Sequence, residues 1–199
     1  MSRDLILQEI RRAKRMATSL PAIDPSRFGL GAQVHDAFVR NVAAAGGRSI
    51  PVERVDAIPD QIRRLFPDAE QAISFVEGVA LDGSDFKQLS SAEKLDNLEV
   101  AVIKGQIGVA ENGAVWITDK NVGHRAVLFI ASHVVIVLNQ QDLVETMHEA
   151  CRRMAGFDAG YGVFVCGPSK TADIEQSLVM GAQGPLTLTI FLVDQHSDA

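Results

Sequence analysis

Apolar and polar residues follow one another along this chain in blocks that predict helices and strands in turn. Apolar positions spaced by three and four residues predict helices over residues 3–17, 34–45, 60–66 and 141–155. Short continuous apolar runs are typical of buried strands. They occur at residues 48–52, 71–76, 98–103, 107–110, 114–118, 126–130, 134–138, 163–166 and 186–193. A further helix is expected over residues 171–180.

Strands that alternate with helices predict an α/β fold with a largely parallel central sheet and flanking helices. The 199 residues, of which 47% are hydrophobic, are enough for one substantial core and predict a single domain over residues 1–199. Residues 1–47 form a helical N-terminal lead-in, which ends at Gly46 and Gly47 in the usual place of a helix C-cap. The polar residues 82–97 are expected to form a long loop.

Charge and hydropathy exclude several classes of function. The net charge of −6 argues against a nucleic-acid surface, which would show clustered Lys and Arg. The basic residues 11–15 lie on a predicted helix, where they form either a solvated face or a docking patch for an acidic partner. No stretch is long enough to span a bilayer, and the charged N-terminus has no apolar segment of signal-peptide length. We therefore expect a cytoplasmic protein.

The cysteines and histidines do not predict a metal centre. Cys151 lies on the apolar stripe of a predicted helix and Cys166 ends a predicted strand, so both are expected to be buried, inert thiols. Two separated cysteines cannot supply the thiolates of an iron–sulfur cluster. The histidines, at positions 35, 124, 133, 148 and 196, show no metal-binding spacing. We expect no metal or redox cofactor on this chain.

Residues 167–175, Gly-Pro-Ser-Lys-Thr-Ala-Asp-Ile-Glu, are the first candidate for chemistry. They follow a predicted strand and open a predicted helix, a junction where free N–H groups and the helix dipole favour anions. An anionic ligand could be held there by the side chains of Ser169, Lys170 and Thr171. The same segment also suits helix capping, in which Asp173 and Glu175 complement the dipole.

Two turns and one histidine complete the candidates. Residues 181–185 join the predicted helix to the last strand, either as a plain turn or as a ligand contact through Gly181, Gln183 and Gly184. Asn112-Gly113, between two predicted strands, is a strong hairpin signal. Glu111, just before it, is either a solvated acid or a general base or nucleophile. His133 precedes an apolar strand and either faces a pocket or serves the structure.

Three of these segments resemble the lactate-utilisation protein C family. Residues 167–185 closely resemble its C-terminal signature. Residues 107–113, Ile-Gly-Val-Ala-Glu-Asn-Gly, look like its Ala-Glu-Thr-Gly-Thr segment, and residues 132–137 look like its Pro-His-Ile-Val strand. The resemblance covers residues 99–193. The family usually has Thr at the positions of Asn112 and Ala114 and His at that of Gln183, so any function of those side chains is altered here.

The resemblance implies both a fold and a role. The family is similar in fold to the ribose-phosphate isomerase, glucosamine-phosphate deaminase and CoA-transferase group, and its members act beside two iron–sulfur proteins that oxidise L-lactate to pyruvate. It implies an accessory or substrate-handling component, not a complete enzyme alone, with iron–sulfur clusters on the partner proteins. A small anionic ligand would lie at Ser169–Thr171, lined by Glu111 and Gly184. The other residues that this interpretation places at the ligand are Asn112, Gly113, His133, Asp173, Glu175, Gly181 and Gln183. A homodimer stays open.

Two other functions stay open beside this one. Glu111-Asn112-Gly113 also looks like the Glu-x-Gly motif of CoA-transferases, in which the glutamate attacks an acyl-CoA. That resemblance implies an independent enzyme with Glu111 as nucleophile, of which a phosphosugar isomerase or a folate cyclo-ligase is a variant. The last possibility is a non-catalytic interaction protein that uses the basic face of its first helix.

Overall fold

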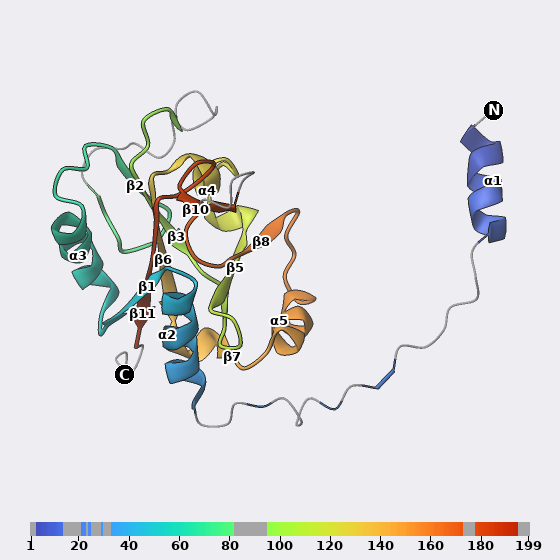
Figure 1. Ribbon diagram of the computed structural model, residues 1–199, viewed down its shortest axis with the longest axis horizontal. Helices are drawn as coiled ribbons and strands as arrows, with labels where there is room; N and C mark the ends of the chain where they lie inside the picture. Colours follow the sequence, from blue (N-terminus) through green and yellow to red (C-terminus); the bar gives the residue numbers. More distant parts are fainter. Residues whose placement is uncertain are drawn as a thin grey trace.

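A parallel five-stranded sheet forms the centre of the structure, a computed structural model that describes residues 3–13, 21, 22, 24, 29, 33–81, 95–172 and 178–194. Neighbouring strands all run in the same direction. In spatial order they are β1 (Arg48–Val52), β11 (Thr187–Val193), β6 (His133–Asn139), β3 (Val100–Lys104) and β2 (Ala72–Ser74), as Figure 1 shows. The expected α/β fold with a parallel central sheet is confirmed.

A second sheet packs against one face of the parallel sheet. Its strands, in spatial order, are β7 (Leu143–Val144), β4 (Ile107–Val109), β5 (Ala114–Thr118) and β8 (Gly162–Val165). Strands β4 and β5 form the antiparallel hairpin that Asn112-Gly113 predicts. A separate hairpin pairs β9 (Lys170–Ala172) with β10 (Leu178–Met180).

The helices lie around these sheets. Within the described residues they are α1 (Arg3–Ala13), α2 (Val34–Ala44), α3 (Ile58–Leu65), α4 (Val127–Ile130) and α5 (Met147–Met154), with 3-10 turns at Val55–Ala57, Asp119–Asn121 and Gln140–Asp142. Helix α2 is followed by Gly46, whose φ of 83° is the left-handed conformation expected after a helix. Helix α1 has no buried residue and lies apart from the sheets (Figure 1).

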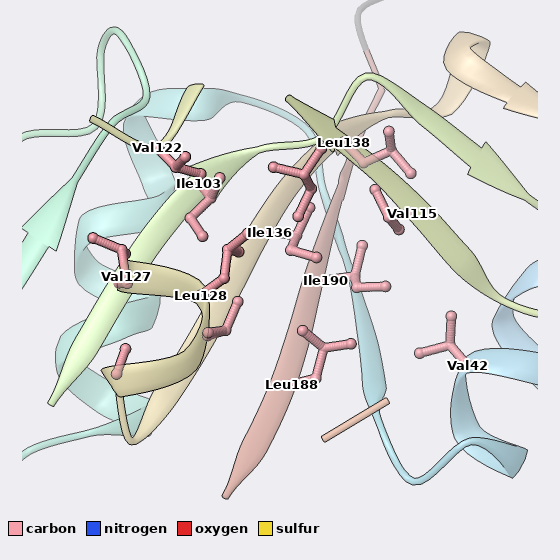
Figure 2. Packing of buried hydrophobic residues seen from close by; sticks show 14 of the residues in the cluster. Val42, Ile103, Val115, Val122, Val127, Leu128, Ile136, Leu138, Leu188 and Ile190 are labelled. Carbon is pink, nitrogen blue, oxygen red and sulfur yellow. The ribbon is translucent and has the colours of Figure 1, made fainter. Parts of the chain in front are cut away.

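The two faces of the parallel sheet are covered by different layers. Successive side chains of a strand point to opposite faces, so alternate residues of β6 enter different cores. Val135 and Val137 pack with Ile58 of α3. On the other face, Figure 2 shows side chains of the parallel strands gathered with Val115 of β5 and Val42 of α2; they include Ile103, Ile136, Leu138, Leu188 and Ile190. Helix α2 and the second sheet therefore cover the face opposite α3.

Helix α5 covers the outer side of the second sheet. On β4, Ile107 and Val109 turn away from the parallel sheet and pack with Ala150 of α5. Trp116 of β5 joins this cluster, and the centroid of its ring lies 4.8 Å from that of Phe164 on β8. The layers are thus α3, the parallel sheet, the second sheet with α2, and α5.

The turn between β4 and β5 lies directly against α2. Gly113 has a φ of 73°, and a Cβ atom added there would lie 2.6 Å from the backbone nitrogen of Val42. The side-chain amide of Asn41 donates to the carbonyl oxygens of Ala110 (2.7 Å) and Glu111 (3.1 Å). Position 113 therefore requires glycine, because its backbone is left-handed and α2 leaves no space for a side chain.

The helix expected over residues 171–180 was a wrong prediction. Lys170–Ala172 instead pairs antiparallel with Leu178–Met180, and residues 173–177 lie outside the described part of the chain. Thr171 lies opposite Val179 in this hairpin, and β-branched pairs favour strands. Ser169 therefore does not begin a helix, and the helix dipole no longer supports an anion site there.

Two other elements differ from the expected ones. Residues 126–130 were expected to form a strand but form α4, in which Val127 and Leu128 are buried while Phe129 and Ile130 are exposed. A short apolar run does not by itself distinguish a strand from a helix. The helix expected over residues 141–155 begins only at Met147, because Leu143–Val144 pairs with β4 as β7.

Both cysteines are exposed, which contradicts the prediction of buried thiols. The inward stripe of α5 is made by Met147, Ala150 and Met154, and Cys151 lies one position beside it. Cys166 follows the last residue of β8, where its thiol donates to the carbonyl oxygen of Asn112 over 3.2 Å. The shorter helix and the strand end explain both differences.

Gly113→Ala is expected to lower the free energy of unfolding by about 3 kcal/mol, because left-handed strain adds to the clash with α2. Gly78→Ala is the matched control. Gly78 has a similar φ of 79°, but its added Cβ would meet Val55 Cγ1 at an ordinary 3.6 Å. The control should therefore lose only about 1 kcal/mol. Urea unfolding measures both, and equal losses would contradict the close contact with α2.

Candidate functional site

Glu111 lies inside the β4–β5 turn and reaches the start of α5. Strand pairing ends at Val109 and resumes at Ala114, so Glu111 is within a four-residue loop and not before it. Its Oε2 accepts the backbone N–H of Met147 at 2.8 Å. The hydroxyl of Thr146 accepts the N–H of Glu149 at 3.3 Å in the same first turn. Glu111 thus acts as a cap of α5, with its side chain at the surface.

Asn112 connects this turn to the segment after β8. Its Oδ1 accepts the N–H of Ala114 at 3.0 Å, which holds the turn. Its carbonyl oxygen accepts the thiol of Cys166. Partial burial raises the pKa of that thiol, and the charge of Lys170 opposes the effect. Cys166 is therefore a protonated donor at neutral pH and not a thiolate.

The segment from Gly167 to Lys170 packs on the end of α2. Gly167 has a φ of 74°, and any side chain there would collide with the carbonyl oxygen of Ala45. The ammonium of Lys170 donates to the same carbonyl oxygen. An added Cβ on Gly46 would lie 3.2 Å from Lys170 Nζ. Lys170 thus satisfies one of the carbonyls that every helix end leaves without a partner.

The residues after β10 fold back onto this segment. The N–H of Ser169 donates to Pro185 (2.8 Å), and the N–H of Gly181 donates to Ser169 (2.9 Å). Gly184 lies on the Ser169 side chain, with its added Cβ 3.1 Å from Ser169 Cβ. Gln183 is exposed nearby. We call the following group at the end of α2 the signature cluster: Asn112, Gly113, Ser169, Lys170, Gly181, Gln183 and Gly184.

His133 does not join the signature cluster. It begins β6 and shares a sheet face with Val135, the face that α3 covers. Its ring stacks on Phe66 with centroids 4.6 Å apart, and its Nδ1 lies 2.9 Å from the Thr187 hydroxyl. Burial lowers the pKa of His133, the charge of Glu99 opposes this, and Arg48 adds to it. These contacts favour a structural role.

The remaining candidates lie beside or beyond the cluster. Thr171 is in β9, and Asp173 and Glu175 lie outside the described residues. The signature cluster itself lies where strands β1 and β11 begin, because Gly47 contacts Leu188 near the start of β11. Open α/β sheets usually bind ligands at the opposite, carboxyl edge. Cys166 does follow the carboxyl end of a strand, but that strand, β8, belongs to the second sheet.

One cavity was not expected from the sequence. It has a volume of about 530 Å³ and is lined by Asp119, Lys120, Gly123, His124, Arg125 and Gly160. Its only signal in the sequence is a run of charged and small residues between two apolar segments. Neither at this cavity nor in the rest of the described chain do three His, Cys, Asp or Glu side chains gather as metal ligands would. No described helix is long and apolar enough to cross a membrane.

Comparison with known proteins identifies the family. The LUD domain matches residues 85–193, which is more than half of the sequence. The chain belongs to the LUD domain family. The match includes β3 to β11 and therefore both the signature cluster and most of the parallel sheet. The resemblance to the lactate-utilisation protein C family is confirmed by the relatives of this LUD domain protein.

Several curated relatives carry the name Lactate utilization protein C. The protein of Shouchella clausii is 32% identical over 119 residues, which are 57% of this chain and 51% of the relative. That of Oceanobacillus iheyensis is 31% identical over 52% of this chain and 46% of the relative. That of Geobacillus kaustophilus is 27% identical over 81% of this chain and 69% of the relative. This LUD domain protein thus spans about half the length of the first two relatives.

A solved structure shows the same fold. The crystal structure of a DUF162 family protein from Deinococcus radiodurans covers 81% of this LUD domain protein and 97% of its own chain, with a TM-score of 0.60. The two sequences are 16% identical. The likeness therefore extends the fold assignment to most of the chain, including part of the region before residue 85.

In this LUD domain protein, Glu111→Ala is expected to lower the free energy of unfolding by about 1 kcal/mol, because α5 loses a charged cap. Glu111→Gln should lose less, since its amide oxygen can still accept the Met147 N–H. Glu53→Ala is the control: this exposed glutamate follows β1, and its loss should stay within about 0.5 kcal/mol. Urea unfolding distinguishes these, and no loss in Glu111→Ala would contradict the capping role.

The free energy of unfolding is expected to fall as the pH falls below 6.5, the usual pKa of histidine. The pKa of His133 is lower in the folded protein than in the unfolded chain. The stabilisation that neutral His133 gives the fold is therefore fully present above pH 6.5, and it is lost as the pH falls through the pKa of His133 in the folded protein. Glu99 adds a similar loss only below its usual 4.5, because backbone N–H groups lower its pKa. In a pH series of urea titrations, His133→Gln should weaken the dependence of the free energy of unfolding on pH between 6.5 and 4.5, where Glu99 does not yet contribute. An unchanged slope in that variant would contradict the assignment.

Proposed function

We propose that this LUD domain protein serves lactate utilisation as an accessory or substrate-handling component, and not as a complete enzyme. The observation that carries the proposal is the likeness of this chain to curated proteins named Lactate utilization protein C. The match of residues 85–193 to the LUD domain supports it. The geometry supports it, because both parts of the C-terminal signature and the β4–β5 turn meet at the end of α2.

The ligand proposed for the signature cluster is a small anion. Lys170 has three N–H donors, of which the carbonyl oxygen of Ala45 takes one, and its side chain is exposed. The hydroxyl of Ser169 and the exposed amide of Gln183 lie on neighbouring segments. Such donors can bind a carboxylate without the helix N-terminus that the sequence predicted. Glu111 is negatively charged, so it would line the site at the turn without binding the anion.

The redox step is proposed to lie on partner iron–sulfur proteins. Cys151 and Cys166 are two thiols on different elements, whereas such a cluster takes four ligands. Helix α1 offers a surface for a partner, because it has no buried residue and exposes Leu5, Ile6 and Ile10. Arg11 and Arg12 at its end suit an acidic partner.

An independent enzyme with Glu111 as nucleophile is the second candidate. Glu111 is exposed, and its Oε1 makes no hydrogen bond within the described part of the chain. A carboxylate of this kind can attack an acyl-CoA. The capping bond to Met147 stabilises the other oxygen, so this role would compete with the cap.

Affinity purification from lactate-grown cells, with mass spectrometry and iron analysis, tests the proposal. Iron–sulfur proteins and lactate-oxidising activity should co-purify with the wild type. Lys170→Gln should reduce that activity about tenfold by removing one charged hydrogen bond. Arg64→Gln, an exposed cation on α3, is the control and should change nothing. Thermal unfolding checks that both variants are folded.

Recovery of the bare protein without iron or partner would overturn the accessory role. A covalent CoA adduct that is lost in Glu111→Gln would then support the independent enzyme. Partner loss in an Arg11→Glu, Arg12→Glu variant, with Lys170→Gln unaffected, would instead favour a protein that acts only through interaction.

A further inference from the structure

The cavity of about 530 Å³ lies at the other end of the second sheet from the signature cluster. We call its lining the charged pocket: Asp119, Lys120, Gly123, His124, Arg125 and Gly160. Strand β5 runs from Ala114, beside the β4–β5 turn, to Thr118, beside the pocket. At about 3.3 Å per residue this separates the two sites by roughly 13 Å.

The charged pocket borders the carboxyl edge of the parallel sheet. The side chain of Asn121 donates to the carbonyl oxygen of Lys104, the last residue of β3, at 3.3 Å. Gly123 lies against the ring of Phe75, the residue that follows β2. Crevices outside the carboxyl ends of parallel strands are where open α/β sheets bind ligands. The pocket therefore has the position that the signature cluster lacks.

Arg125 is oriented toward the pocket by two contacts, one with an aromatic ring and one with a carboxylate. Its guanidinium lies over the ring of Tyr161, 4.8 Å from the centroid, and donates to Asp119 Oδ2 at 3.2 Å. The N–H of Asp119 in turn donates to the carbonyl oxygen of Tyr161 at 3.0 Å. An added Cβ on Gly160 would lie 3.2 Å from Asp119 Oδ2, so the absence of a side chain leaves room for the pair. The other guanidinium donors make no hydrogen bond within the described residues.

Two further donors line the charged pocket. Lys120 pairs with Asp158 at 3.3 Å, but both side chains are largely exposed, so this pair competes weakly for the ammonium. His124 accepts the N–H of Ala126 on its Nδ1 at 3.2 Å, which places the proton of the neutral ring on Nε2. A guanidinium, an ammonium and an imidazole N–H thus surround one space, and its single lining carboxylate is already paired with Arg125.

Asp119 contributes to the pocket by holding Arg125 and not by contacting a ligand. Its Oδ2 accepts from Arg125, while its Oδ1 is buried without a hydrogen-bond partner within the described part of the chain. A buried oxygen is out of reach of a group that enters the open pocket, so the ligand is recognised by the three donors alone.

We propose that the charged pocket binds an organic anion, with Arg125, Lys120 and His124 on the anionic group. The anionic group is a carboxylate or a phosphate ester, which the same donors bind. This site is independent of the signature cluster and does not depend on a role in lactate utilisation.

Isothermal titration of the full chain tests the proposal with three probes. Propionate carries a carboxylate, glycerol 3-phosphate carries a phosphate ester, and glycerol, which has no charge, is the control. Saturable binding of at least one anion and no binding of glycerol are expected. The anion that binds more tightly identifies a carboxylate or a phosphate ligand. Absence of saturable binding by both anions would overturn the proposal.

Two variants assign the binding to the charged pocket. Arg125→Gln should raise the Kd about tenfold or more, because it removes the charged donor. Arg153→Gln is the matched control: it breaks a surface pair with Glu149 at the same 3.2 Å, outside the pocket, and should leave the Kd unchanged. An unchanged Kd in Arg125→Gln would overturn the assignment.

A measurement on the wild type covers the case in which Arg125→Gln does not fold. In a ¹H–¹⁵N correlation spectrum, the bound probe should shift the amide signals of Gly123 and Gly160. The amides of Gly181 and Gly184 should stay in place. The reverse pattern would place the ligand at the signature cluster, which would support the proposed function and overturn this inference.

Discussion

At the end of α2 the backbone of one element touches the backbone of another, with no side chain between them. Gly113 lies against Val42, and Gly167 lies against Ala45 one turn further along the helix. Two segments that are more than fifty residues apart in the sequence are thereby fixed on the same helix. The carbonyl oxygen of Ala45, at the end of α2, then accepts from Lys170. The segment that contains Gly181 and Gly184 is in turn held on Ser169, so it is placed at the same helix end.

Whether the sequence predicted an element depends on whether that element is determined by its own residues or by a distant neighbour. The strands of the parallel sheet are buried on both faces, so they appear as continuous apolar runs such as residues 134–138, and these predictions are confirmed. The Asn-Gly turn was predicted by its own backbone preference. Leu143–Val144, by contrast, is a strand only because β4 lies beside it, and no local pattern reports a neighbour from another part of the chain.

The signature segment shows the same limit for function. Ser169, Lys170 and Thr171 suited a helix start as separate residue types, but their pairing with Leu178–Met180 made a hairpin. The segment does lie beside the β4–β5 turn, to which the contact between Cys166 and Asn112 connects it. The helix start that was the physical reason for an anion site is absent, and the role of these residues stays a prediction. Arg125 and Asp119 were missed, since an ion pair that is positioned by Tyr161 requires the end of β5 to meet the start of β8.

Strand β5 has the turn with Asn112 at one end and Asp119 just beyond the other, with buried apolar residues between them. A rigid strand keeps the two ends apart and also insulates them, because a substitution at one end changes neither the contacts nor the charge at the other. Asn112, Ala114 and Gln183, which depart from the usual residues of the lactate-utilisation protein C family, all lie at or near the first end. The protein is therefore modular along this strand: the signature end can be redesigned by substitution without altering the contacts that line the charged pocket.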